Sequence, residues 1–152
     1  MRSSAAPALL PHVAPSCPYS SLLLFGIRRM AAGGLSDAHA AHAFFTGFGL
    51  GYRRPLVLLR AFMAELSRVS VARLVVAPIC CPRASEAEHL IITAVAQSPV
   101  DPDATHAALS SLLHVRECIG LITSAQAVAA SFADLGMPLT IECNSCNRDG
   151  PF

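Results

Sequence analysis

The feature that most constrains this chain is a series of helix-forming segments, each bounded by residues that start or stop helices. Ser85 is followed three residues later by Glu88, the pattern of a capping box at a helix N-terminus. Pro102 suits the first turn of a helix, and Gly33 with Gly34 suits a helix end. These signals predict helices over residues 20–32, 37–48, 54–71, 85–97 and 102–115, and a last one from Thr123 or Ser124 to Leu135.

The clearest helical periodicity lies in the segment that begins after Pro55. Its apolar positions recur every three or four residues and predict one buried stripe: Leu56, Leu59, Met63, Leu66 and Ser70. Residues 74–77 are apolar and β-branched, which predicts a short extended connector. The chain is therefore expected to be all-α, a compact bundle of about six short helices with one extended connector.

The composition favours one folded domain with a tail at each end. Hydrophobic residues make up 53% of the 152 residues and charged residues 14%, which excludes general disorder. Residues 1–18 predict a flexible tail, 19–139 a helical domain, and 140–152 a second flexible tail. The first tail is interrupted by prolines, and the longest uncharged run beyond it is too short for a bilayer. We expect a cytoplasmic protein with no membrane span and with reduced cysteines.

The charge is distributed unevenly along the chain. Residues 19–83 carry eight arginines against two acidic residues, and residues 84–152 carry two arginines against eight acidic residues. All 11 basic residues are arginine, and the net charge is only +1. The two halves are expected to attract each other, either within one fold or across a homodimer. The alternative is a basic surface that meets an acidic partner or nucleic acid.

Four arginines surround the segment 54–71 and form the candidate binding site. Arg53 and Arg60 are seven residues apart and share a face, whereas Arg54 and Arg68 are expected elsewhere around the helix. They could contact an acidic partner or phosphates. They could instead form internal salt bridges, either to Glu65 or to the acidic half of the chain.

Other charged residues receive structural interpretations. Arg28 and Arg29 are expected to be solvated on the first helix. Ser36 is expected to cap the second helix, with Asp37 in its first turn. His39 and His42 share a face of that helix and are interpreted as surface residues.

Cys80 and Cys81 are adjacent thiols between two prolines and leave three interpretations open. They could join Cys143 and Cys146 as four thiolate ligands of zinc or an iron–sulfur cluster, although adjacent cysteines point in divergent directions. They could be redox-active, with Arg83 and the next helix N-terminus favouring the thiolate. The interpretation we favour is that both are buried at a helix junction, and that the Cys143–Cys146 pair lies in an unstructured tail.

Four stretches carry a resemblance to a known family. They are Leu-Phe-Gly-Ile-Arg-Arg-Met at 24–30, Gly-Leu-Ser-Asp-Ala at 34–38, Arg-Arg-Pro-Leu-Val-Leu-Leu-Arg-Ala-Phe-Met-Ala-Glu at 53–65, and Ala-Pro-Ile-Cys-Cys at 77–81. They resemble a family of small, all-helical, uncharacterised proteins from alphaproteobacteria, a domain of unknown function, over roughly residues 22–139. The resemblance implies no activity, and Ile79 stands where that family is expected to have a third cysteine.

Taken together, the sequence predicts a non-enzymatic interaction or regulatory module that uses an arginine-rich face. The expected partner is a macromolecule, a protein rather than nucleic acid. The alternative is a thiol-dependent protein, metal-binding or redox, that uses Cys80 and Cys81.

Overall fold

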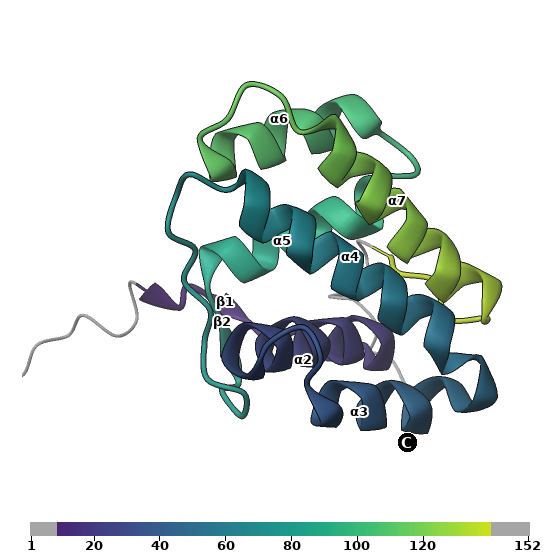
Figure 1. The fold of residues 1–152 in the computed structure, drawn as a ribbon. Helices are drawn as coiled ribbons and strands as arrows, with labels where there is room; N and C mark the ends of the chain where they lie inside the picture. Colours follow the sequence, from purple (N-terminus) through teal and green to yellow (C-terminus); the bar gives the residue numbers. More distant parts are fainter. Residues whose placement is uncertain (1–8, 141–152) are drawn as a thin grey trace, which may run out of the picture.

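The computed structural model describes residues 9–140, and Figure 1 shows a mostly helical fold. The helices are α2 (Pro18–Gly33), α3 (Ala38–Phe48), the 3-10 helix η1 (Gly49–Tyr52), α4 (Arg53–Val69), α5 (Glu86–Gln97), α6 (Pro102–Leu113) and α7 (Ile119–Asp134). The helical prediction is confirmed in outline. It is wrong in detail, because β1 (His12–Val13) and β2 (Arg83–Ala84) form an antiparallel two-stranded sheet. The count of about six helices is also slightly off, since η1 adds a separate helical turn.

The helix starts follow local chemistry, with two corrections. The capping box is confirmed, because the Ser85 hydroxyl accepts from the Glu88 amide and the Glu88 carboxylate accepts from the Ser85 amide. Asp37, and not Ser36, caps α3, because its carboxylate accepts from the amide of Ala40. The last helix begins four residues before Thr123, whose hydroxyl donates back to a helix carbonyl instead of capping.

The core lies where α4 packs along α7, two helices that run side by side in Figure 1. The predicted buried stripe of α4 faces this core, although Ser70 lies just past the helix end and is half-buried. Phe44 and Phe132 are completely buried and meet edge to face, with ring centroids 6.1 Å apart. Gly26 lets α2 pack closely against α3 and α4. A Cβ at this position would lie 2.8 Å from the side chain of Leu59 and 2.9 Å from that of Phe44.

Part of the expected N-terminal tail takes part in the fold. His12 pairs with Ala84 and Val13 with Arg83, and α2 begins at Pro18. The division at residues 18 and 139 otherwise stays a prediction. Of the helices in residues 9–140, none is long and apolar enough to cross a membrane.

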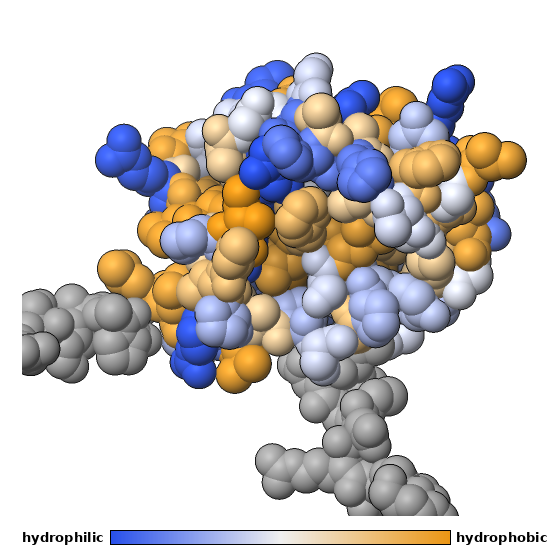
Figure 2. All heavy atoms as spheres, turned by 90° about the horizontal axis from the view of Figure 1, so that it is seen from below, coloured by the Kyte–Doolittle hydropathy of each residue, from blue (hydrophilic) through white to orange (hydrophobic). Residues whose placement is uncertain are grey.

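The helix α3 lies at the lower edge of Figure 1 and is poorly covered, burying only Ala40 and Phe44. Figure 2 shows this side of the molecule as a mixture of hydrophobic and hydrophilic residues. An extended segment, residues 70–82, then leads from α4 to β2. It crosses the surface beside α2 and carries the two adjacent cysteines.

Candidate functional site

The outer surface of η1 and α4 forms one continuous stripe, because both helices follow each other without a break at Arg53. Helical spacing of three and four residues places its members on the side of α4 opposite the buried stripe. We call these residues the outer stripe: Leu50, Arg53, Val57, Arg60, Ala61, Ala64 and Arg68. Arg68 is about four turns beyond Arg53 and so joins the stripe, which corrects its expected position elsewhere on the helix.

Two of the four candidate arginines are held by internal ion pairs. Arg54 lies beside the stripe and donates to Asp134 of α7 at 2.7 Å. Arg68 donates twice to Glu65, at 2.9 and 2.6 Å, one turn earlier on α4. Glu65 and the acidic half of the chain, which contains Asp134, are the internal salt-bridge partners that the sequence left open as the alternative to an external ligand. Both pairs are on the surface, where ion pairs contribute little to stability.

The other two arginines are less constrained. Arg53 is exposed, and no hydrogen bond or ion pair to residues 9–140 holds it. Arg60 is half-buried, and its Nε is buried without a hydrogen-bond partner in the described part of the chain. Two large apolar side chains stand in the same stripe, Leu50 with 92% of its surface exposed and Val57 with 56%. The stripe therefore combines guanidinium groups with uncovered apolar surface.

The cysteines lie in a tight turn in which the amide of Cys81 donates to the carbonyl of Pro78 at 3.0 Å. Cys80 is exposed and Cys81 is half-buried. The expectation that both are core residues is wrong, because the turn lies on the surface and leaves Cys80 open to solvent. Beside it lies a groove of about 430 Å³, lined by the two cysteines, Ile79, Arg28 and residues of α2 and the N-terminal segment.

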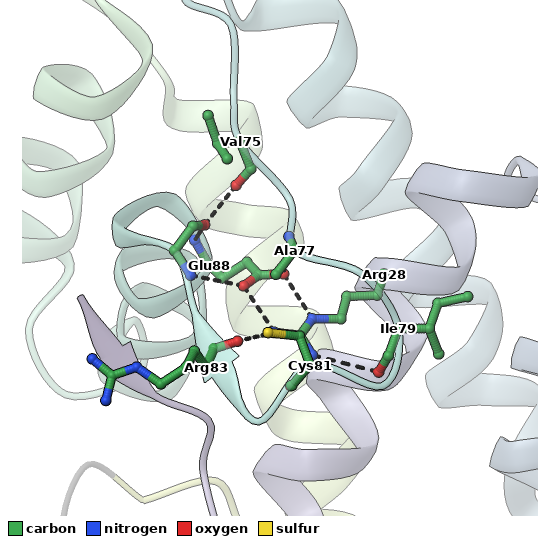
Figure 3. Close-up of polar contacts among 8 residues, drawn as sticks. Arg28, Val75, Ala77, Ile79, Cys81, Arg83 and Glu88 are labelled. Atoms are coloured by element: carbon green, nitrogen blue, oxygen red, sulfur yellow. Dashed lines mark hydrogen bonds and ion pairs between the residues drawn. The ribbon is translucent and has the colours of Figure 1, made fainter. Parts of the chain in front are cut away.

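A buried ion pair holds this turn in place (Figure 3). Arg28 Nε donates to Glu88 Oε1 at 2.8 Å, and Arg28 Nη2 donates to Glu88 Oε2 at 3.1 Å. The two side chains are only 3% and 0% exposed. The expectation that Arg28 is solvated is wrong. The sequence did contain a signal for its burial, because Arg28 follows one helical turn after Leu24, which is buried on the same face of α2.

Every polar atom of this pair has a partner. Arg28 also donates to the carbonyls of Cys81 at 2.9 Å and Arg83 at 2.7 Å, with a longer contact to Ile79 at 3.5 Å. Glu88 also accepts from the amides of Ala77 and Ser85. Burying two charges costs several kcal/mol per ion unless such bonds replace the lost water. Because its donors are all used, Arg28 is a support for the turn and not a ligand-binding group.

Arg83, expected beside the thiols, donates instead to the carbonyls of Leu10 and Pro11 at 3.1 and 2.8 Å. The N-terminus of α5 is occupied by its own capping box. The two groups expected to favour a thiolate therefore have other partners. Cys143 and Cys146 lie outside the described residues, and residues 9–140 contain no group of three or more His, Cys, Asp or Glu that could hold a metal.

Arg29 is also engaged instead of solvated. It donates to both carboxylate oxygens of Asp37, at 3.0 and 2.7 Å, and its Nη2 lies 2.7 Å from His39 Nδ1. The hydrogen bonds from Arg29 hold the pKa of Asp37 far below its ordinary value. His42, on the same face of α3, is exposed. The pair of Arg29 and Asp37 joins the end of α2 to the start of α3, and within residues 9–140 the two histidines belong to no group that could hold a metal.

Comparison with known proteins gives one result. No curated protein and no solved structure matches this chain. A model of a family of unknown function (DUF6628) matches residues 3–135, which includes the N-terminal segment that the resemblance did not reach. Since that match spans most of the 152 residues, the chain belongs to the family of unknown function DUF6628.

Proposed function

We propose that this protein is a non-enzymatic interaction module that binds an acidic segment of another protein along the outer stripe. The observation that carries the proposal is the exposure of Leu50 and Val57 on the same face as Arg53 and Arg60. Protein interfaces are enriched in arginine and in apolar anchors, with the charges at their margins. A cytoplasmic location and the absence of catalysis are part of this proposal.

The mixed chemistry of the stripe favours a protein over nucleic acid. Contacts to phosphates need charge, and they make no use of an exposed leucine and valine. An acidic amphipathic helix would use both, because its carboxylates would meet Arg53 and Arg60 while its apolar side chains cover Val57. A second copy of this chain, presenting its acidic half, is the homodimeric version of the same contact.

The test uses two probes, a synthetic amphipathic helix of Glu and Leu residues and a single-stranded oligonucleotide of equal charge. Binding is followed by NMR chemical shifts of the backbone amides. We expect the peptide to shift amides of η1 and α4, and the substitution R53A to weaken it several-fold with helicity unchanged. The matched control is R116A, which removes an exposed arginine in the loop before α7. Tighter binding of the oligonucleotide, or equal effects of R53A and R116A, would contradict the proposal.

A second candidate function is favoured by the exposure of Cys80 beside its groove. We propose thiol-dependent binding as this alternative, with Cys80 and Cys81 supplying two ligands and Cys143 and Cys146 two more for zinc or an iron–sulfur cluster. Native mass spectrometry of anaerobically purified protein tests it directly. Added mass that disappears in C80S/C81S supports it, and a bare mass in the wild type removes it.

A further inference from the structure

Two imidazole rings are stacked face to face where β1 meets α5. The rings of His12 and His89 have centroids 3.9 Å apart and planes inclined by 7°. His12 Nε2 also contacts the carboxylate of Glu86, which is exposed at the start of α5. Two neutral imidazole rings can stack at this distance without electrostatic repulsion between net charges. Two imidazolium ions would bring like charges together, with one carboxylate to compensate for both.

His12 belongs to the N-terminal segment that leads into α2, and the contacts of this segment lie at the surface of the fold. We call residues 9–17 the N-terminal strap. Besides the β1–β2 pairing, the amide of Ala14 donates to the carbonyl of Pro82 at 2.9 Å, and the Ser21 hydroxyl donates to the carbonyl of Pro15 at 2.7 Å. Arg83, which belongs to β2, donates hydrogen bonds to the carbonyls of Leu10 and Pro11 in the strap. A two-stranded pairing of this size is marginally stable without such support.

The strap contributes Ala14 to the lining of the groove beside the cysteine turn. Pro18 at the start of α2 lines the same groove, and so do Cys80 and Cys81. The turn itself is fixed by the buried pair of Arg28 and Glu88. The groove thus lies between a turn that is anchored by a buried ion pair and a strap residue that is held by surface contacts.

We propose that the N-terminal strap is a pH-sensitive gate, which leaves β2 and α5 and opens the groove at the cysteine turn when both stacked histidines are protonated. Glu86 on α5 is the carboxylate that faces the two rings, and its charge favours the protonated form of His89. Arg83 on β2 is the other charged side chain beside the strap, and its guanidinium donates to the carbonyls of Leu10 and Pro11. The inference is independent of the proposed function of the outer stripe.

The direction of the pH dependence follows from the docked geometry. Partial burial and the nearby His12 lower the pKa of His89 from its ordinary 6.5, while Glu86 acts in the opposite direction. His89 therefore binds a proton less readily in the docked state than in the released one. Docking is strongest above about pH 6.5 and weakens as the pH falls below it.

The experiment measures the hydrogen-exchange protection of the Ala14 amide by NMR, at about pH 7.5 and about pH 5, with protection factors corrected for intrinsic exchange. In the wild type we expect protection to fall roughly tenfold or more at the lower pH. In H89Q, where only one ring can be charged, we expect a fall of less than about twofold. The Ala77 amide, which donates to buried Glu88, is the internal control and should keep its protection.

Two further readings decide the proposal. The NMR titration midpoint of His89 should lie below 6.5 in the wild type and rise in H12Q, since His12 contributes to lowering it. Equal pH dependence of Ala14 protection in wild type and H89Q would overturn the gate. So would a wild-type strap that stays protected at about pH 5.

Discussion

Two arginine–carboxylate pairs of similar length occupy opposite environments in this molecule. Arg28 and Glu88 are 2.8 Å apart and almost completely buried, whereas Arg54 and Asp134 are 2.7 Å apart with more than half of each side chain exposed. Distance alone does not distinguish them. The difference lies in what replaces water, since the buried pair has backbone groups on its remaining donors and acceptors and the surface pair has solvent.

The largest expected effect comes from breaking the buried pair. The substitution R28M leaves Glu88 buried without its charged partner, and we expect the free energy of unfolding to fall by about 3–5 kcal/mol. Urea denaturation followed by circular dichroism measures the loss. The matched variant is R28M/E88M, which removes both charges and should recover part of it. A loss of less than about 1 kcal/mol in R28M would show that the buried pair of Arg28 and Glu88 does not stabilise the fold.

An intermediate case is the pair of Arg29 and Asp37, which is neither fully buried nor fully exposed. Because the pKa of Asp37 is lowered in the fold, its stabilising contribution is complete above the ordinary value of 3.8 and is lost as the pH falls below it. We therefore expect wild type to be more stable than D37N at about pH 7, with the gap closing toward about pH 2. Denaturant midpoints across this range provide the measurement, and a constant gap would be contrary to the expectation.

The smallest effect is expected at the surface. The substitution R54A should lower the free energy of unfolding by about 0–1 kcal/mol, because solvent and salt already screen this pair. Raising NaCl from about 0.05 M to about 1 M should erase the difference from wild type. The same salt change should leave the R28M defect in place. If R54A is as damaging as R28M, burial is not what separates the two pairs.

The sequence predicted those parts of the fold that depend on near neighbours. The capping box at Ser85 and the proline start at Pro102 are local signals, and both helices begin where expected. The apolar spacing on α4 likewise identified its buried side. The placement of Cys80 was missed, because its exposure depends on a turn fixed by α2 and α5 and not on the apolar character of neighbouring residues.

The candidate site was predicted in part. Helical spacing placed Arg53 and Arg60 together, and the acidic half was named as one source of partners for Arg54. The buried pair of Arg28 and Glu88 was not foreseen, because the two residues are 60 positions apart and each has a plausible local role. The stacking of His12 on His89 was missed for the same reason, since the first lies in a segment expected to be a tail.

The separation between Arg28 and Glu88 also has a consequence for how the chain folds. Their contact closes a loop that contains α3, η1, α4 and the extended segment, so its formation is opposed by the entropy of ordering that whole stretch. Neither charge can leave water at low cost before the other arrives with its backbone partners. We therefore expect the contact to form after the folding transition state, so that its loss chiefly speeds unfolding and shortens the lifetime of the native protein.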